Sequence, residues 1–334
     1  MKNIYIIAEA GVNHNGSIDI AKKLIDKAKD AGADAVKFQT FKAESLVSKN
    51  ASKADYQKTN TSVSESQLQM LKKLELTENE HRELLKYSNY RNIEFLSSPF
   101  DEESAAFLIS LGLKILKIPS GEITNIPFLK FLADQNVKII LSTGMSDLSE
   151  VSLAVSSLNK GKDLTLLHCV TEYPAPFNEI NLKAMETLKK EFEIPVGYSD
   201  HTSGIEIALA AAALGAEVIE KHFTLDKNME GPDHKASLNT EELKNMIIGI
   251  RNIEAALGNG RKIPAVIEMK NINIARKSLV VNHEMKKGTK LLKEDLCIKR
   301  PGTGIKPVNF TKVIGMTLIR DIDSDEVLNW EDLI

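Results

Sequence analysis

The 334-residue sequence has few cysteines, no long apolar run and almost no net charge. Its two cysteines, Cys169 and Cys297, stand inside apolar runs, which argues against the disulfide framework of a secreted protein. No stretch approaches the ~18 uncharged apolar residues that a membrane span requires. The first residues, MKNIYIIAEAGVNHNG, lack the apolar region of a signal peptide, because Glu9 interrupts the run. We therefore expect a cytoplasmic protein without a membrane segment.

The charge balance excludes another group of partners. The sequence contains 43 lysines and arginines against 46 acidic residues, a net charge of -3. Such a chain has no excess of positive charge with which to bind nucleic acid or an anionic membrane. Any anionic ligand must therefore be held by a few individually placed cations. The 43% hydrophobic and 27% charged residues are ordinary for a globular protein, and the length allows one large domain and one small one.

Short apolar runs alternate with amphipathic helical patterns as far as residue 258. This alternation is typical of parallel βα units. The expected strands begin near Ile4, Ala35, Ile93, Ile115, Lys138, Leu164, Ile194 and Glu217. Eight such units in residues 1–258 predict an α/β fold, the (βα)8 TIM barrel. The alternative is a doubly wound open sheet, but the first expected strand is not followed by G-x-G-x-x-G.

Capping residues mark the expected helices. Ser17 precedes the first helix and Gly32 follows it, and the pairs Thr77–Glu80 and Asn239–Glu242 have capping-box spacing. One connection departs from the regular rhythm. Residues 41–76 form a long polar segment with a short helical piece at 64–75, and long connections of this kind are usually functional or mobile.

After Gly258 the pattern changes. Residues 259–282 contain polar, glycine- and proline-containing pieces and are interpreted as a linker. From His283 to Ile334 short strands and turns replace the βα rhythm, which predicts a small β-rich domain. A domain of that size buries little apolar surface, so we expect it to pack on the barrel or on a partner.

Polar side chains end every expected barrel strand. In a parallel barrel the active site lies at the C-terminal ends of the strands, so these residues are predicted to share one rim. They are Glu9, Lys37, Gln39, Ser97, Ser98, Lys117, Ser120, Ser142, Thr143, Thr171, Tyr173, Ser199, His201, Glu220 and His222.

Lys37 and Lys117 lie inside runs that should be buried, and a lysine is rarely buried without a partner. Three interpretations stay open. The first is a salt bridge to a barrel acid such as Glu9 or Glu122. The second is binding of a phosphate or carboxylate, to which nearby serine hydroxyls would also donate. The third is a Schiff-base lysine, because a desolvated lysine can act as a nucleophile.

His201 and His222 end adjacent strands, which favours a shared divalent metal over two separate core histidines. Imidazoles with few hard ligands suit Mn, Fe, Co or Zn, and an open coordination position permits Lewis-acid chemistry on a carbonyl. Glu220 either assists the metal or pairs with a buried lysine.

The Glu9 carboxyl has two interpretations. Burial would raise its pKa and prepare it for proton transfer, or it would form a buried ion pair. Asp233 either belongs to a Gly-Pro turn or faces a hydroxylated substrate.

These residues predict a barrel enzyme that acts on a small phosphorylated or carboxylated molecule. At the same positions the sequence resembles the sialic acid synthase family, nonulosonate synthases that condense phosphoenolpyruvate with an N-acetylated hexosamine. The segments that carry the resemblance are IAEAGVNHNGS, AVKFQTF, LSSPFD, KIPSGE, LSTGM, LHCVTEYPAP, GYSDHTSG, EKHFTLDKNMEGPDHKAS and KRPGTGI. Residues 283–334 resemble the antifreeze-like (SAF) domain of that family.

The resemblance implies a role for each matching position. His201 and His222 match two metal ligands, usually of manganese, with magnesium or cobalt as alternatives. Glu9 matches a carboxylate near the reacting centre. The phosphoenolpyruvate pocket is matched by Lys37, Ser98, Lys117, Ser120 and Ser199, with Ser142 beside it. The groups that meet the sugar are matched by Gln39, Tyr173 and Asp233, and Thr171 stands where some members have asparagine.

Arg300, in KRPGTG, matches an arginine that the SAF domain of one subunit inserts into the partner's barrel. The resemblance therefore implies a domain-swapped homodimer. The implied sugar is 2,4-diacetamido-2,4,6-trideoxymannose or N-acetylmannosamine, giving N,N'-diacetyllegionaminate or N-acetylneuraminate with cleavage of the phosphate C–O bond. A Schiff-base pyruvate lyase and a non-catalytic sugar-binding barrel are the competing hypotheses.

Overall fold

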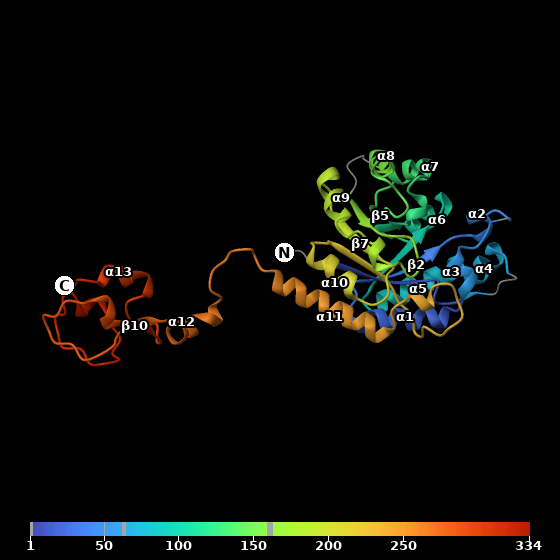
Figure 1. Cartoon of the computed structure of the whole chain (residues 1–334). Helices are drawn as coiled ribbons and strands as arrows, with labels where there is room; N and C mark the ends of the chain where they lie inside the picture. Colours follow the sequence, from blue (N-terminus) through green and yellow to red (C-terminus); the bar gives the residue numbers. More distant parts are fainter. Residues whose placement is uncertain (1–2, 50, 62–64, 159–162) are drawn as a thin grey trace. The chain divides into compact units, whose positions relative to one another are not determined.

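The computed structural model describes residues 3–49, 51–61, 65–158 and 163–334 (Figure 1). The chain forms two compact units, Met1–Gly258 and Asn259–Ile334, and each is described by itself. Within the described ranges, none of the helices has the length and apolar character needed to cross a membrane.

Eight parallel strands form the barrel of the first unit (Figure 1). They are β1 (Tyr5–Gly11), β2 (Ala35–Thr40), β3 (Glu94–Pro99), β4 (Ile115–Ile118), β5 (Lys138–Ser142), β6 (Leu164–His168), β7 (Val196–Asp200) and β8 (Val218–His222). Their hydrogen-bonded order is β3-β2-β1-β8-β7-β6-β5-β4, and β4 also lies against β3, so the barrel is nearly closed. The predicted (βα)8 fold is confirmed, and each strand begins within two residues of its expected position.

Helices connect the strands and cover the barrel. They are α1 (Ile18–Ala31), α2 (Ala43–Leu46), α3 (Asp55–Asn60), α4 (Gln67–Leu74), α5 (Glu78–Tyr90), α6 (Glu102–Ser110), α7 (Ile126–Ala133), α8 (Leu148–Leu158), α9 (Ala184–Phe192), α10 (Glu206–Ala213) and α11 (Thr240–Leu257). The expected caps are present. Ser17 accepts a hydrogen bond from the Ile20 amide, Gly32 adopts φ +90° at the end of α1, and Thr77 and Asn239 form capping boxes.

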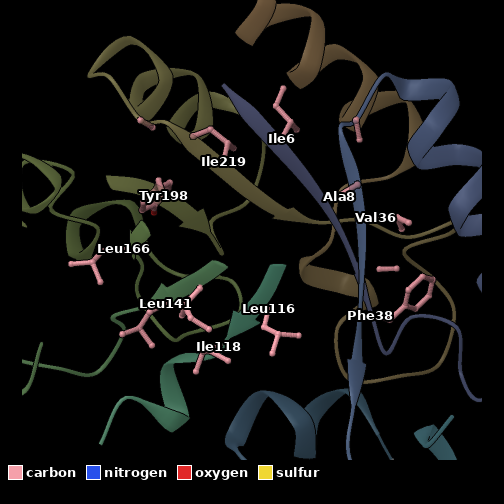
Figure 2. Close-up of a cluster of buried hydrophobic side chains, with 14 of the residues drawn as sticks. Ile6, Ala8, Val36, Phe38, Leu116, Ile118, Leu141, Leu166, Tyr198 and Ile219 are labelled. Carbon is pink, nitrogen blue, oxygen red and sulfur yellow. The ribbon is translucent and has the colours of Figure 1, made fainter. Parts of the chain in front are cut away.

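Side chains alternate along each strand between the helices and the barrel interior. Figure 2 shows the outward-facing layer, which packs with apolar helix residues as one core. Its labelled members are Ile6, Ala8, Val36, Phe38, Leu116, Ile118, Leu141, Leu166, Tyr198 and Ile219. The interior holds a second, separate apolar cluster of Ile7, Ala35, Leu96, Ile140, Leu167 and Val218.

The inward-facing side chain changes from apolar to polar over two residues on β1, β2, β3, β5 and β8. Because side chains two positions apart share a face of the strand, Glu9 stands on the same face as Ile7, and Lys37 on the same face as Ala35. The same relation places Ser98 after Leu96, Ser142 after Ile140 and Glu220 after Val218. The apolar cluster therefore forms a floor beneath a polar layer at the C-terminal strand ends.

A buried ion pair joins β7 to β8 on their outward faces. The Lys221 Nζ atom donates to Asp200 Oδ2 at 2.7 Å and to the carbonyl of Thr202 at 2.6 Å. Asp200 Oδ1 in turn accepts from the amide and the hydroxyl of Thr202. Neither charged side chain is exposed, so the pair is held only by these contacts. It restrains the backbone on either side of His201 and immediately before His222.

The long connection between β2 and β3 contains α2, α3 and α4 and forms a small apolar cluster with Val12 from the segment after β1. Val12, Phe41, Met70 and Leu74 are buried together there. The Asn60 side chain donates to the carbonyl of Pro232 at 2.9 Å, which ties α3 to the loop after β8. The predicted helical piece is observed as α4, while residue 64 lies outside the described residues.

The second unit has its own apolar core. Its elements are α12 (Met269–Ala275), β9 (Ser278–Val281), β10 (Leu296–Lys299) and α13 (Phe310–Val313). The core consists of Leu279, Val281, Met285, Leu291, Leu296, Ile305, Val313, Leu318, Ile322 and Leu328. The interpretation of residues 259–282 as a linker is corrected here. The range contains α12, and β9 pairs with β10 and buries all four of its residues, so the small domain begins before His283.

Candidate active site

A cavity of about 310 Å³ opens at the C-terminal ends of the barrel strands. Of the strand-end residues predicted to share this rim, only Ser97 and Thr143 do not line the cavity: the Ser97 hydroxyl bonds with that of Thr40, and the Thr143 hydroxyl donates to the carbonyl of Leu167. The predicted site residues that line it are Glu9, Lys37, Gln39, Ser98, Lys117, Ser120, Ser142, Thr171, Tyr173, Ser199, His201, His222 and Asp233. Arg300 lies in the second unit, where its Nε atom donates to the carbonyl of Ala275 at 3.0 Å, so its role at this cavity stays a prediction.

Two lysines and two carboxylates form the charged centre of the cavity. Lys37 Nζ lies 2.8 Å from Glu9 Oε2 and 3.7 Å from Glu220 Oε2. Lys117 Nζ lies 3.3 Å from Glu220 Oε1. All four residues are buried, and all four line the cavity. The salt-bridge interpretation of the lysines is therefore correct, and it is compatible with anion binding because the same ammonium groups face the cavity.

The four charges shift one another's pKa values. Burial raises the pKa of Glu9 to about 7, although Lys37 opposes this shift. Burial also acts to raise the pKa of Glu220, but Lys117 and Lys37 outweigh it and lower the value to about 2. Glu220 is therefore ionised at neutral pH, whereas Glu9 exchanges its proton there. Burial lowers the pKa of Lys117, while the charges of Glu220 and Glu9 overcome burial and raise the pKa of Lys37.

Hydroxyl groups surround this centre. The Ser98 hydroxyl accepts from Lys37 at 3.0 Å, and the Ser199 hydroxyl donates to Glu220 at 3.0 Å. The hydroxyl oxygens of Ser142 and Thr171 are buried and have no hydrogen-bond partner. Buried polar groups are normally satisfied, so these two atoms indicate a ligand rich in oxygen.

Gly144, which follows β5, allows the hydroxyl groups of Ser120 after β4 and Thr171 after β6 to lie close to the backbone. Its amide donates to the Ser120 hydroxyl at 3.0 Å. A Cβ atom at this position would lie 2.3 Å from the Thr171 hydroxyl oxygen and 2.8 Å from Cys169 Sγ, which is closer than van der Waals contact permits. The glycine is therefore required by close packing around Ser120 rather than by backbone conformation.

The two histidines are neutral and close together. The rings of His201 and His222 have centroids 5.6 Å apart. His201 Nδ1 lies 2.7 Å from the carbonyl of Val170. A carbonyl can only accept, so we assign the proton to Nδ1, which leaves a lone pair on Nε2 near the Tyr173 hydroxyl at 3.1 Å. Burial lowers the pKa of His201 to about 4 and that of His222 well below its ordinary value.

These imidazoles fit a divalent metal with open positions. His222 Nδ1 is buried without a hydrogen-bond partner, and it lies 3.9 Å from Asp233 Oδ2. Neutral imidazole is the form that binds metal. Throughout the described part of the chain, no three His, Cys, Asp or Glu side chains gather closely enough to enclose a metal ion. The remaining ligands would therefore have to be water or substrate, as in catalytic sites that keep an open position.

Asp233 reaches the cavity from the loop after β8, where Ser237 of the same loop and Asn13 of the loop after β1 hold its backbone. Asn13 donates to the Ser237 hydroxyl at 2.9 Å, and that hydroxyl donates to the Asp233 carbonyl at 2.7 Å. Burial raises the pKa of Asp233 to about 6. Sequence reasoning missed Asn13, because its role depends on contacts with residues more than two hundred positions away.

Sequence reasoning also missed an apolar part of the lining. It is formed by Leu46, Val47, Met70, Leu71 and Leu74, all from the connection between β2 and β3. The unusual length of that connection was the one sign in the sequence that it contributes to the site. Its position over the cavity could not be predicted, because no regular strand or helix rule orients such a segment.

The fold and the site define a (βα)8 enzyme whose cavity combines buried lysines, a carboxylate pair and two neutral imidazoles. The chain belongs to the NeuB family, whose model matches residues 24–262. A SAF domain model matches residues 276–334, which agrees with the observed start of β9. The resemblance to the sialic acid synthases and the antifreeze-like end domain are therefore confirmed.

Relatives cover nearly the whole chain. A protein of Campylobacter jejuni named N,N'-diacetyllegionaminic acid synthase is 56% identical over 98% of this chain and 99% of its own length. A protein of the same name from Legionella pneumophila is 50% identical over 98% of this chain and 94% of its own length. The crystal structure of N-acetylneuraminic acid (sialic acid) synthetase from Leptospira borgpetersenii serovar Hardjo-bovis, in complex with citrate, matches with a TM-score of 0.73. It is 39% identical, and the match covers 81% of this chain and 90% of that one.

Anion binding to the charged centre should depend on the protonation of Glu9. Below a pH of about 7 this carboxyl becomes neutral, and the centre gains positive charge. We expect sulfate, which does not titrate in this range, to bind the metal-free protein roughly tenfold more tightly at about pH 6.5 than at about pH 8.5. Isothermal titration calorimetry at the two pH values measures the difference.

The control variants separate Glu9 from other titrating groups. Glu9→Gln should bind sulfate with nearly the same affinity at both pH values. Glu179→Gln, a change at an exposed carboxylate outside the cavity, should keep the pH dependence of the native protein. If Glu9→Gln retains the full dependence, the proton is taken up elsewhere and the assignment to Glu9 is wrong.

Proposed function

We propose that this nonulosonic acid synthase condenses phosphoenolpyruvate with 2,4-diacetamido-2,4,6-trideoxymannose and water, giving N,N'-diacetyllegionaminate and phosphate. The observation that carries the proposal is the identity of 56% and 50%, over nearly the full chain, to two relatives named N,N'-diacetyllegionaminic acid synthase. The charged cavity supports it, because its buried lysines suit a small ligand that carries both phosphate and carboxylate. We propose that the reaction takes place in the cytoplasm.

The cavity residues supply the parts that this reaction needs. Lys37 and Lys117 neutralise the phosphate and carboxylate of phosphoenolpyruvate, and the neighbouring serines donate hydrogen bonds to them. Carbon 3 of phosphoenolpyruvate attacks the sugar aldehyde, water adds to carbon 2, and phosphate leaves by C–O cleavage. Holding both reactants together can lower the barrier by roughly 7–11 kcal/mol. Glu9, with its pKa raised to about 7, exchanges a proton with the attacking water or the new alkoxide.

We propose that His201 and His222 hold a divalent metal, most simply Mn²⁺, with Mg²⁺ or Co²⁺ as alternatives. The unpaired Nδ1 atom of His222 and the low pKa of both imidazoles support this assignment. When bound, the metal supplies a Lewis acid that polarises the aldehyde oxygen.

We also propose a domain-swapped homodimer in which Arg300 enters the barrel of the partner subunit and meets the sugar. Arg300 is exposed on the second unit. A guanidinium suits this task, because it stays charged and presents several donors in a rigid plane.

The substrate assay tests the proposed function directly. Protein, Mn²⁺ and phosphoenolpyruvate are incubated with either hexosamine, and phosphate release and product mass are measured. We expect kcat/KM for the diacetamido sugar to exceed that for N-acetylmannosamine by at least about tenfold. Equal or better use of N-acetylmannosamine would assign the neuraminate reaction instead, and no phosphate release with either sugar contradicts synthase activity.

Metal removal tests the histidine pair. Dialysis against a chelator should lower turnover at least about a hundredfold, and Mn²⁺ should restore it. His222→Asn should weaken Mn²⁺ binding, followed by electron paramagnetic resonance, while His283→Asn on the exposed surface of the second unit should not. Full turnover after chelation rules out the metal.

Subunit complementation tests Arg300. Arg300→Ala should raise KM for the hexosamine about tenfold or more while the KM for phosphoenolpyruvate and the circular dichroism spectrum stay unchanged. Mixing Arg300→Ala with Glu9→Gln, which lacks the proton-exchanging carboxyl, should recover activity, because a mixed swapped dimer contains one complete site. Arg261→Ala is the matched control at an exposed arginine. Unchanged hexosamine kinetics in Arg300→Ala contradict the swap.

A further inference from the structure

The cavity lining has two chemically different parts. The strand ends contribute mainly charged and hydroxyl groups, whereas the β2–β3 connection contributes five apolar side chains together with the amides of Gln57 and Gln67. We call the five apolar side chains the apolar wall, and they are Leu46, Val47, Met70, Leu71 and Leu74. The reaction chemistry described above uses none of these residues.

One face of α4 forms most of the apolar wall. Gln67, Met70, Leu71 and Leu74 follow the spacing i, i+3, i+4 and i+7, which brings them to one side of the helix, and all four line the cavity. Leu68, on the same helix, does not line it. The helix is therefore oriented so that three apolar side chains and the amide of Gln67 border the cavity.

The apolar wall is held in place by contacts of its own. Met70 and Leu74 are only 3% and 7% exposed and are packed with Val12 and Phe41. Lys72 Nζ donates to Glu44 Oε1 at 2.5 Å, which links α4 to α2. Ser66 and Gln69 close a capping box at the start of α4. A wall fixed in this way can discriminate between ligands, because it does not need to be ordered by them.

Phosphoenolpyruvate does not account for this surface, because its phosphate and carboxylate are matched by the lysine centre. A hexose with hydroxyl groups at every position fits it poorly as well, since a hydroxyl buried against leucine side chains loses its hydrogen bonds to water. A sugar with methyl groups at its periphery fits, because each buried methyl gains hydrophobic stabilisation.

We propose that the apolar wall determines sugar specificity by accepting the C6 methyl group and the C4 acetamido methyl group of a 2,4-diacetamido-2,4,6-trideoxyhexose. N-acetylmannosamine carries hydroxyl groups at both positions, and the wall disfavours it. This inference rests on the proposed function and adds the residues that would select among hexosamine substrates. It assigns chemistry to the strand ends and sugar selection to α2 and α4.

A polar substitution on the wall tests the inference. Leu71 is half-buried, so Leu71→Gln changes the wall without opening the core. We expect kcat/KM for the diacetamido sugar to fall about tenfold or more, while kcat/KM for N-acetylmannosamine stays the same or rises. The KM for phosphoenolpyruvate should not change. The ratio of the two kcat/KM values is the quantity that reports specificity.

Matched variants make the result specific to the cavity face. Leu68→Gln introduces the same chemical change on the same helix away from the cavity and should leave the ratio unchanged. Leu71→Met keeps the position apolar and should preserve the native ratio. Val47→Thr is a nearly isosteric polar change at the residue of the apolar wall that follows α2. It provides an independent measurement of the ratio if Leu71→Gln is unstable.

The outcomes separate this inference from the proposed function. A native enzyme that does not use the diacetamido sugar contradicts the proposed function. A native enzyme that prefers this sugar, and keeps its preference in folded Leu71→Gln or Val47→Thr, contradicts the apolar wall alone. An equal loss of preference in Leu68→Gln also overturns the inference, because the effect would then come from the helix rather than from contact with the sugar.

Discussion

The site depends on how two lysines are kept charged inside the barrel. Lys37 and Lys117 are buried where an unpaired ammonium would be very costly, and Glu220 lies between them, 3.7 Å from one and 3.3 Å from the other. Glu9 adds a second carboxylate that exchanges its proton near neutral pH. The charges nearly cancel in the protein alone, which lets the barrel fold, yet both ammonium groups face a cavity where an anion can meet them. A chain with net charge -3 can in this way hold a highly anionic substrate.

The charged centre lies between an apolar layer of the barrel interior and an ion pair on the outer faces of the strands. Beneath it, Ile7, Val218 and their neighbours form an apolar floor. Outside it, the buried pair of Lys221 and Asp200 connects β7 to β8 next to His201 and His222. The two histidines thus stand on adjacent strands whose separation is restrained by an ion pair that does not line the cavity. The positions of the reactive side chains at the strand ends therefore depend on how the outward faces of the same strands are packed.

Catalysis and specificity use different parts of the fold. The strand ends are rigid and carry groups suited to anion binding, proton transfer and metal binding. The β2–β3 connection packs in a small cluster separate from the main barrel core, together with Val12 from the segment after β1. Its aliphatic face on α4 offers a means of choosing among sugars while the reacting groups remain the same. Asn60, which bonds the loop of Asp233, joins this connection to the polar side of the cavity.

The sequence by itself determined the barrel, the helix caps and the ring of polar residues at the strand ends. The alternation of strands and helices predicts the barrel, and in a parallel barrel the C-terminal ends of all strands lie at one rim. The sequence could name Glu220 and the two lysines but could not choose their pairing. Only the tertiary structure decided that Glu220 contacts both, that His222 Nδ1 has no partner, that β9 belongs to the second unit and that α4 turns Met70, Leu71 and Leu74 toward the cavity. These features depend on contacts between residues far apart in the chain, and local periodicity carries no information about which distant side chain will be the neighbour.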